Sequence, residues 1–423
     1  MNHTHSILEL ELAYGHSTLP VRLPADRVQA VIEPRAEGEP GSETDLLAQA
    51  LAHPIGTPRL RDLATPGQKV VIVTSDLTRP CPSERLLPPI LDELAAAGVD
   101  DSDITIILAL GLHRPMTGPE MEKAVGSDVY HRVRVLNHDP NDTIRLGVTS
   151  AGTPVEIYRP VVQADLRVCL SNLELHYFAG YSGGAKAILP GCASRAAVNA
   201  NHAMMVRPEA KAGRLEGNPV RADLEEGVAL LDADFILNVV VDGQHRIVGA
   251  VAGEVTAAHR QGCQMVAERG IVPIGRRADL VLVSAGGSPK DVNMYQAQKA
   301  LDNAAYALRD GGILILVAEC PEGLGNPTFE TWMTTAGSPD AVLEMIQKEF
   351  VLGGHKAAAV AAVQKRAAIY LVSALPDELV RQMGMRPFAT VEAALGAAQS
   401  TLGDQASILV MPQGGSVLPL ASA

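Results

Sequence analysis

The chain of 423 residues is 47% hydrophobic and 20% charged, with 3% aromatic residues and a formal net charge of −13. This length exceeds what one hydrophobic core supports, so we predict two domains or more, with aliphatic cores. The acidic balance argues against a nucleic-acid partner, because phosphate backbones bind clustered Lys and Arg. A small anionic substrate remains compatible with this charge, since a local basic cluster can override the net field.

The sequence shows no sign of export or membrane insertion. The N-terminal stretch MNHTHSILELELAYG has neither the basic nor the apolar region of a signal peptide. The longest apolar runs have about half the length of a membrane span. Five scattered cysteines without a Cys-x-x-Cys pair indicate small, reduced, buried thiols. We therefore expect a cytoplasmic protein without a membrane partner.

The first apolar runs predict strands at residues 69–76, 103–111, 165–173 and 234–242. The run HRIVGAVAGE (245–254) is the expected hairpin partner of the fourth strand. Helices are expected after the first two strands. Gly98 ends the first of these helices, and Pro119 suits the first turn of the second.

A second series of apolar runs predicts strands at residues 278–287, 311–320 and 367–375. The segment RGIVPIGRRAD (269–279) is expected to be a linker, and the pattern of MPQGGSVLPLASA assigns no element to the C-terminal end. Continuous apolar strands covered by helices are typical of parallel sheets. We therefore predict an α/β fold of two domains, residues 1–270 and 271–423, with mostly parallel, doubly wound sheets.

Polar side chains follow four of the predicted strands, in TSDLTRPCPS, GLHRPMT, SNLELHYFAGYSGGAK and SAGGSPKDVNMYQAQKAL. In open α/β sheets, ligands bind beyond the carboxyl ends of the strands. Because the four segments come from both expected domains, we expect an active-site cleft between the domains. The candidate residues are Asp76, Arg79, His113, Arg114, His176, Lys186, Gln296 and Lys299.

Several of these residues allow two interpretations, one structural and one functional. Arg79 is either a surface arginine paired with Asp76 or a bidentate clamp for a carboxylate or phosphate. His113 and His176 are either loop histidines with a capping role or acid–base groups. His202, in the expected helix SRAAVNANHAM, is either a structural histidine or a ligand.

The lysine of the Gly-rich stretch GYSGGAK does not belong to a P-loop. That motif needs a second glycine and a hydroxyl beside the lysine, and here Ala185 and Ala187 stand in those places. The sequence also lacks a G-x-G-x-x-G fingerprint after the first strand and an H-E-x-x-H zinc motif. A backbone phosphate cradle and a covalent amine site at Lys186 both remain open.

The motifs taken together resemble the nickel-dependent lactate racemase family. SDLTRP, GLHRPMT, HYFAGYSGGAKAILPG, NANH and YQAQKAL occur in the family's order and spacing, and the resemblance covers nearly the whole chain. It implies two α/β domains with the active site between them. The Gly-rich lysine block is its most diagnostic part.

The resemblance also implies a cofactor and residue roles. The cofactor is a nickel-pincer nucleotide, a pyridinium mononucleotide whose two sulfur-bearing arms and ring carbon hold nickel. Lys186 would form a thioamide with one arm, and His202 would be the protein ligand of nickel. His113 and His176 would be the acid–base pair. The substrate contacts would be Arg79, Gln296 and Lys299, and the cofactor segment would be Asp76, Leu77, Thr78 and Arg79.

The implied reaction is racemisation or epimerisation of a 2-hydroxy acid such as lactate. The C2 hydrogen would leave as hydride while a histidine takes the hydroxyl proton, and it would return to the other face of the keto acid. Two bases of near-neutral pKa suit such a reaction. The few aromatic residues favour a short aliphatic substrate, and Tyr295 and His355 are candidates for lining its pocket. The enzymes that build the cofactor are then expected partners.

Two functions from other classes fit the same residues. A lysine Schiff-base or metal-assisted lyase would use Lys186 and the histidines, and it predicts carbonyl trapping by borohydride and no nickel. A non-catalytic nucleotide-binding or carrier protein predicts cofactor binding without turnover. Mass and metal analysis of protein made with the cofactor-building enzymes distinguishes all three.

Overall fold

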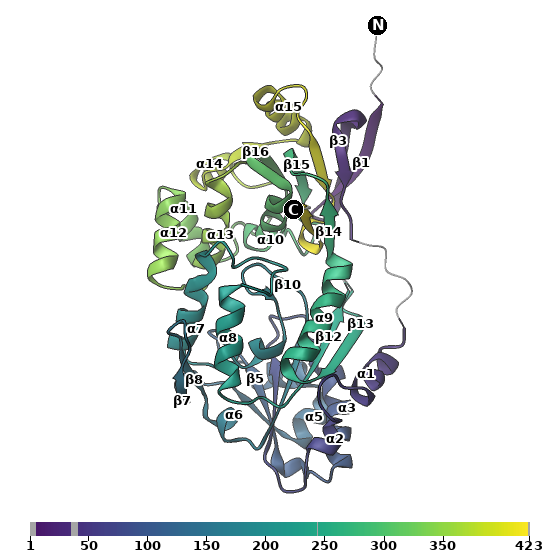
Figure 1. Cartoon of the computed structure of the whole chain (residues 1–423). Helices are drawn as coiled ribbons and strands as arrows, with labels where there is room; N and C mark the ends of the chain where they lie inside the picture. The colour runs from purple at the N-terminus through teal and green to yellow at the C-terminus, as the bar shows by residue number, and fades with distance from the viewer. Residues whose placement is uncertain (1–5, 35–40, 243, 422–423) are drawn as a thin grey trace. The chain divides into compact units, whose positions relative to one another are not determined.

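The computed structural model describes residues 6–34, 41–242 and 244–421. The chain forms two compact units, one of residues 37–268 and the other of residues 1–36 together with 269–423. Each unit has a six-stranded sheet and several helices (Figure 1), which confirms the predicted two-domain α/β class. Within the described ranges, no helix is both long and apolar enough to cross a membrane.

The sheet of the unit 37–268 is parallel except at one edge. Its order is β6 (Arg134–Asn137), β5 (Ile104–Ala109), β4 (Val70–Ser75), β9 (Leu166–Asn172), β12 (Phe235–Val241) and β13 (Ile247–Gly253). Only β12 and β13 are antiparallel, and they form the predicted hairpin. The chain runs outwards from β4 to β6 and then returns to β9, from which it runs the other way. The reversal between β4 and β9 is the switch point at which such sheets bind ligands.

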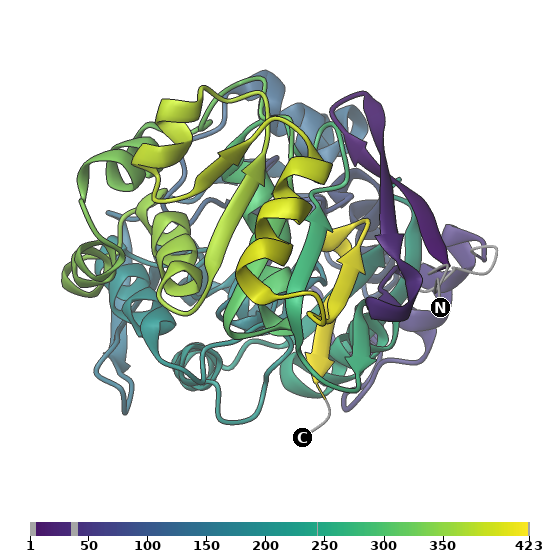
Figure 2. The same ribbon diagram turned by 90° about the horizontal axis from the view of Figure 1, so that it is seen from above.

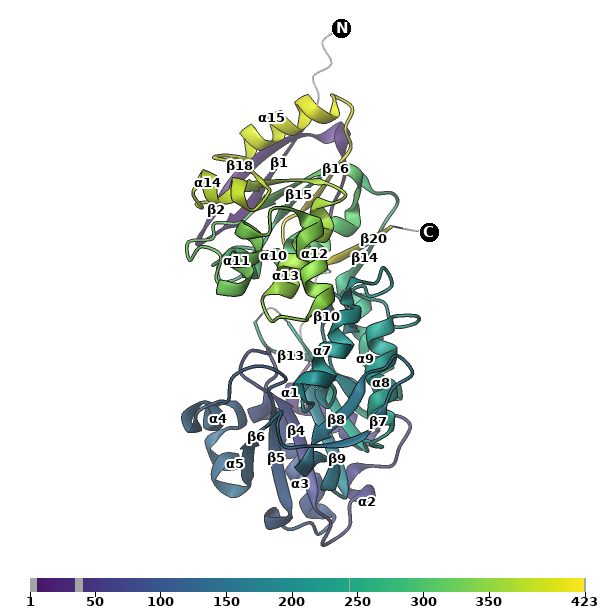
Figure 3. The same cartoon turned by 90° about the vertical axis from the view of Figure 1, so that its left-hand side faces the viewer.

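Successive residues of each strand point to opposite faces, so this sheet has two cores. Val70 and Ile72 of β4 belong to one core, and Val71 and Val73 to the other. The first face is covered by α1 (Glu43–Ala52), α2 (Leu60–Leu63), α3 (Ser83–Ala96), α4 (Gly118–Val125) and α5 (Ser127–Arg132). The second is covered by α6 (Arg159–Gln163), α7 (Arg195–Ala203), α8 (Pro219–Ala229), α9 (Val255–Gly270) and the ribbon of β7 (Thr143–Val148) and β8 (Pro154–Tyr158). Figure 3 shows α7, α8 and this ribbon close together. Helices on both faces confirm a doubly wound sheet.

A short ribbon and a 3-10 turn complete this unit near the switch point. The ribbon consists of β10 (Leu175–His176) and β11 (Gly180–Tyr181), and the turn is η3 (Gly184–Ala187). Both lie in the segment that follows β9, and Ala185 and Ala187 of the turn pack into the second core. The segment with the Gly-rich motif is therefore part of the packed structure.

The sheet of the other unit is entirely parallel. Its order is β18 (Arg386–Phe388), β17 (Ala368–Val372), β16 (Leu308–Val317), β15 (Ala278–Ser284), β19 (Ile408–Met411) and β3 (Val28–Val31). One face packs against α15 (Val391–Leu402) and the hairpin of β1 (Ile7–Tyr14) and β2 (Ser17–Pro24), as Figure 2 shows from above. The other helices are α10 (Met294–Ala304), α11 (Pro327–Thr335), α12 (Pro339–Lys348), α13 (Gly354–Gln364) and α14 (Asp377–Gln382). The helix α10 follows β15, where the strand order reverses.

The structure differs in two places from the domain ranges that were expected from the sequence. β3 pairs in parallel with β19, so the first 36 residues belong to the second unit and not to a domain 1–270. The expected linker 269–279 contains β14 (Ile271–Ile274), which pairs in parallel with β20 (Leu418–Ala421) at the C-terminal end. Both pairings join segments far apart in the sequence. Local patterns do not reveal such partners, because strand formation depends on context.

Candidate active site

Three loops leave the carboxyl ends of β4, β5 and β9, at and beside the switch point of the sheet. The first carries Asp76, the second His113 and the third Lys186. The amide N–H of Gly111 in the second loop donates to the carbonyl oxygen of Gly191 in the third, at 2.9 Å. The structure thus places Asp76, His113 and Lys186 at the carboxyl ends of strands of one sheet, as their sequence positions predicted.

Asp76 is a buried carboxylate that orients His113. Its Oδ2 lies 2.6 Å from Nδ1 of His113, and its Oδ1 accepts from the backbone N–H and the hydroxyl of Thr78, at 3.0 and 2.6 Å. Because the carboxylate accepts, the imidazole carries its proton on Nδ1 and leaves Nε2 for proton exchange. Burial alone would raise the pKa of Asp76, but the hydrogen bonds from His113 and Thr78 outweigh it and lower that pKa.

The same turn presents Arg79. Both carboxylate oxygens of Asp76 are engaged by Thr78 and His113, so the structure does not show the alternative ion pair between Asp76 and Arg79. Arg79 is exposed, as are Leu77, at 43% of its surface, and Thr78. An exposed guanidinium at a strand end can bind a carboxylate or phosphate bidentately.

The glycines before Lys186 fit their loop to the protein behind it. Gly180 and Gly184 adopt φ angles of 79° and 59°, which glycine tolerates without strain. A Cβ at Gly180 would lie 2.1 Å from the carbonyl oxygen of Arg214. The N–H of Gly184 donates to Oδ1 of Asn238 at 2.9 Å, so it is not available to a phosphate. Close internal packing therefore explains these glycines.

His176 is held by a backbone N–H and an aromatic ring. Its Nδ1 accepts from the N–H of Ala179 at 3.2 Å, which places the proton of the neutral ring on Nε2. The ring of Phe178 meets His176 edge-on, with centroids 4.5 Å apart, and meets His202 in the same way at 4.9 Å. Phe178 therefore packs against both histidines that flank the lysine loop in the sequence.

Two groups of this loop have pKa values that are shifted towards the neutral form. Burial lowers the pKa of His176 well below its ordinary value, and the nearby cationic groups Lys186 and Arg79 act in the same direction. Burial likewise lowers the pKa of Lys186 well below its ordinary value, followed by the charges of Arg79 and Arg221, while Glu174 opposes the shift. A neutral amine is the form of lysine that attacks an electrophile.

His202 lies on α7, and a chain of hydrogen bonds orients its ring. Its Nδ1 lies 3.0 Å from Oδ1 of Asn201. The amide nitrogen of Asn201 donates to Oδ2 of Asp223 at 2.8 Å and to the carbonyl oxygen of Val220 at 3.1 Å. Because those two groups only accept, the amide oxygen of Asn201 must face His202 and accept from its Nδ1–H. Nε2 keeps its lone pair, as a metal-binding histidine requires.

The predicted substrate residues Gln296 and Lys299 belong to the other unit. They are exposed and lie three positions apart on α10, so they share one face of the helix that follows β15. In the same unit, the rings of Tyr295 and His355 meet edge-on with centroids 6.5 Å apart. That these residues act together with the residues of unit 37–268 stays a prediction.

Arg114, from the same strand-end set, has a structural role. Its guanidinium donates to both carboxylate oxygens of Glu120, at 2.6 and 2.8 Å. Glu120 also forms a capping box with Thr117 at the start of α4. Hydrogen bonds from Arg114 and Thr117 lower the pKa of Glu120 to about 2. Arg114 therefore stabilises a helix start.

Several contacts that support the site were not predicted from the sequence. They are the contact of Asp76 with His113, the contacts of Asn201 and Asp223 that orient His202, and the contacts of Arg221 with the lysine loop. Asn201 precedes His202 directly in NANH, so its contact with the histidine could have been predicted from the sequence. Asp223 and Arg221 come from α8, and no local pattern connects them to the motifs.

Two family models match the chain: the lactate racemase N-terminal domain at residues 14–213 and the lactate racemase C-terminal domain at residues 275–419. The lactate racemase of Thermoanaerobacterium thermosaccharolyticum is 36% identical over 421 residues, which cover 97% of this chain and 98% of that protein. The lactate racemase of Lactiplantibacillus plantarum is 32% identical over 387 residues, covering 89% of this chain and 91% of that protein.

Solved structures agree with the sequence relatives. The lactate racemase apoprotein from Thermoanaerobacterium thermosaccharolyticum matches with a TM-score of 0.88 and 36% identity, over 97% of this chain and 100% of that chain. A Thermotoga maritima protein that is 20% identical, with a TM-score of 0.63 over 92% of this chain and 100% of that chain, shares the fold. The resemblance inferred from the motifs is confirmed: the chain belongs to the lactate racemase family, and it is an isomerase of the racemase type.

Proposed function

We propose that the protein racemises a 2-hydroxy acid, with lactate or a similar short aliphatic acid as its substrate. Two relatives that match most of the chain are lactate racemases. The observation that carries the proposal is the presence of two differently supported histidines, His113 and His176, in loops at the carboxyl edge of the same sheet. Inverting a carbon centre requires proton transfer for each enantiomer, and histidine suits both transfers at neutral pH.

Lys186 and His202 support a lysine-bound nickel-pincer nucleotide as the cofactor. The lowered pKa of Lys186 favours the neutral amine that a thioamide link needs, and His202 has a lone pair on Nε2. No group of three or more His, Cys, Asp or Glu side chains among the described residues is arranged to hold a metal ion. His202 would be the protein ligand of nickel, and the sulfur and ring-carbon atoms of the cofactor would supply its other ligands. When bound, the cofactor would supply an acceptor for the hydrogen of substrate C2.

The two histidines offer complementary hydrogen-bonding groups to the substrate. His113 presents an unprotonated Nε2, and Asp76 stabilises the positive charge that this ring gains when it accepts the hydroxyl proton. Neutral His176 presents Nε2–H, because its Nδ1 faces the N–H of Ala179. His113 can therefore accept a proton, and His176 can donate a hydrogen bond. Such a pair suits a substrate that alternates between a hydroxyl group and a keto group.

We assign the substrate carboxylate to Arg79, whose exposed guanidinium stands in the loop after β4. Gln296 and Lys299 keep their proposed roles as further contacts of the carboxylate and hydroxyl. Leu77 and Thr78 keep theirs as cofactor contacts, and the enzymes that build the cofactor remain proposed partners. Membership in a racemase family favours this function over the lyase and over the non-catalytic nucleotide-binding protein.

The test uses protein made together with the cofactor-building enzymes. We expect racemisation of L- and D-lactate by chiral chromatography, nickel by metal analysis, and a covalent mass adduct that Lys186→Ala abolishes. Lys211→Ala, which changes an exposed lysine, is the matched control and should keep the adduct. C2-deuterated lactate should keep its label during early turnover in ordinary water. Extensive loss of the label would contradict hydride transfer, and an adduct that persists in Lys186→Ala would contradict the tether.

A further inference from the structure

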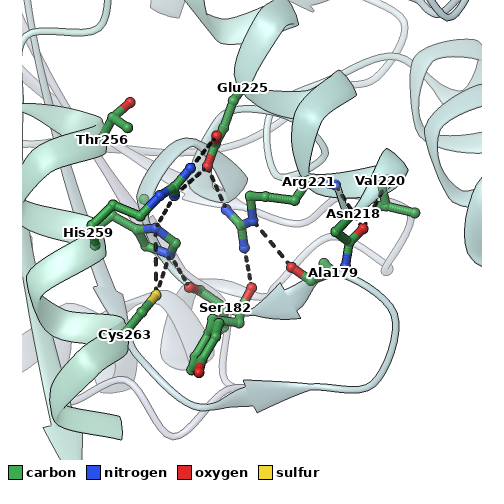
Figure 4. Close-up of polar contacts among 12 residues, drawn as sticks. Ala179, Ser182, Asn218, Val220, Arg221, Glu225, Thr256, His259 and Cys263 are labelled. Atoms are coloured by element: carbon green, nitrogen blue, oxygen red, sulfur yellow. Dashed lines mark hydrogen bonds and ion pairs between the residues drawn. The ribbon is translucent and has the colours of Figure 1, made fainter. Parts of the chain in front are cut away.

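The loop that carries Lys186 is tied to a buried arginine behind it. Arg221, on the first turn of α8, is 1% exposed. Its Nε donates to the carbonyl oxygen of Ala179 at 3.2 Å, and its Nη2 donates to the carbonyl oxygen of Tyr181. Figure 4 shows the guanidinium of Arg221 directed at the carbonyl group of Ala179. One rigid side chain thus fixes two peptide groups just before the lysine.

Two more side chains hold the next residues of the loop. The carbonyl oxygen of Ser182 accepts from Nε2 of His259 on α9, at 2.8 Å. Burial, then the charge of Arg221, lowers the pKa of His259 to about 3, so its ring stays neutral at physiological pH. The N–H of Gly184 is bound by Asn238 of β12. Side chains from α8, α9 and β12 therefore fix the backbone on the N-terminal side of Lys186.

The cluster of Arg221, Glu225 and Arg260, which lies next to the lysine loop, carries a positive charge that is not fully balanced. The nearest carboxylate to Arg221 is Glu225, with Nη1 and Oε1 3.7 Å apart, and Nη1 has no hydrogen-bond partner. Both oxygens of Glu225 are already engaged by Arg260, each at 2.8 Å. Burial lowers the pKa of Arg221 to about 10, which keeps the side chain protonated at neutral pH. Two arginines therefore share one carboxylate, although buried charges are usually paired.

We propose that Arg221 is a positioning residue of the active site: it fixes the loop that presents Lys186 and sets the reactivity of the lysine amine through its unbalanced charge. This inference rests on the proposed role of Lys186 as the cofactor tether. The fork geometry explains why arginine is needed, since lysine cannot donate to two carbonyl groups from one rigid plane. After burial and Arg79, Arg221 is among the causes that lower the pKa of Lys186.

The experiment measures two properties of the protein without cofactor. Hydrogen exchange of peptides from residues 174–193 reports the loop, and the pH profile of Lys186 acetylation by acetic anhydride, read by peptide mass mapping, reports the amine. Arg221→Met removes the fork and the charge, while Arg221→Lys keeps the charge and removes the fork. Arg167→Met is the matched control. Arg167 is also largely buried, pairs with Asp234 and donates to the carbonyl oxygens of residues 161, 162 and 164, outside this loop.

We expect Arg221→Met to speed exchange in the loop by about ten- to hundredfold, as the loss of charge-assisted hydrogen bonds predicts. The midpoint of the Lys186 acetylation profile should move to higher pH, because a positive charge that disfavours the ammonium form is gone. Arg221→Lys should speed the exchange while the midpoint stays near that of the unmodified protein. Arg167→Met should change neither property of the loop.

The result that overturns the proposal is loop exchange in Arg221→Met no faster than in Arg167→Met, or an unchanged acetylation midpoint. If Arg221→Met fails to fold, the test rests on Arg221→Lys. Unchanged hydrogen exchange of the loop in that variant would equally contradict the proposal. These readouts need no cofactor, so they stand even if the cofactor does not attach at Lys186. A missing adduct would instead contradict the proposed function, whatever Arg221 does.

Discussion

The loops after β5 and β9 each present one histidine, but they support it in opposite ways. His113 has a carboxylate behind it, because Asp76 is buried, ionised and hydrogen-bonded to Nδ1. His176 has a backbone N–H at Nδ1 and cationic groups around it, and burial keeps it neutral. The protein therefore places a negative charge next to His113 but not next to His176.

This difference indicates what the substrate must contribute. A histidine that accepts a proton needs a negative charge nearby to stabilise the imidazolium. Asp76 provides that charge for His113 before any ligand binds. His176 can accept a proton at Nε2 only if its ring gives up the tautomer that the N–H of Ala179 favours. We expect a bound 2-hydroxy acid to favour that change and to supply the negative charge, through its own carboxylate. The two histidines would then become comparable as proton acceptors only in the complex with the substrate.

The largest expected effect comes from removing either histidine. His113→Ala and His176→Ala should each lower racemisation by about 10²–10⁴-fold, the usual contribution of an acid–base group. Chiral chromatography of the product, starting from each pure enantiomer, measures this loss. His131→Ala, at an exposed histidine on α5, is a matched control and should keep full activity. Normal turnover in either variant would show that the replaced histidine does not transfer a proton in the reaction.

Asp76→Asn should have the next largest effect. It removes the charge next to His113. Because the amide oxygen must accept from Thr78, the amide N–H then faces Nδ1 and favours the wrong tautomer, so we expect kcat/KM to fall by up to about 10⁴-fold. Glu120→Gln, which changes a carboxylate bound to Arg114, should have little effect on kcat/KM. Equal losses in both variants would show that the Asp76–His113 pair has no special part in the reaction.

The titration of His176 tests whether the substrate supplies the missing negative charge. In the protein without ligands, its NMR signals should show a neutral ring well below pH 6.5, its ordinary pKa. Because the unfolded chain then binds a proton that the folded ring does not, this histidine makes stability fall as the pH drops below 6.5. Adding a 2-hydroxy acid should raise the pKa of His176, since a carboxylate stabilises the imidazolium. A pKa that does not rise would contradict the idea that the substrate supplies the charge.

Phe178→Leu should have the smallest effect. The phenyl ring packs edge-on against His176 and His202, and such ring pairs contribute about 0.5–1.5 kcal/mol. We therefore expect kcat to fall only a few-fold, with Lys186 still able to take its adduct. Steady-state kinetics and intact mass measure the two properties. A loss as large as that of His176→Ala would mean that Phe178 does more than hold the rings.

The sequence was most informative where chemistry follows a strand. Short apolar runs predicted β4, β5, β9 and β12 nearly to the residue, because buried parallel strands carry a continuous apolar pattern. The same runs located Asp76, His113 and Lys186, since each stands in a loop that follows such a strand. The family resemblance then gave these residues roles that position alone left open.

The sequence was least informative where contacts join distant segments. The alternation in ILELELAY is typical of a strand, but nothing in it shows that this hairpin covers a sheet made mostly of residues 278–411. Arg221 has no motif around it, and its role depends on carbonyl groups about 40 residues earlier that only folding brings near. Pairings of this kind are set by the packed structure, whereas motifs report local geometry.

The discontinuous second unit has a consequence for the order in which the protein is made. The chain leaves this unit after residue 36 and returns to it at residue 269, so β3 must wait for β19 before it has a neighbour in its sheet. Residues 37–268 have no such wait, and during synthesis they are complete before β15 exists. Since domains fold as units while the chain grows, this unit can place His113, His176, Lys186 and His202 once residue 268 has left the ribosome, without waiting for β19.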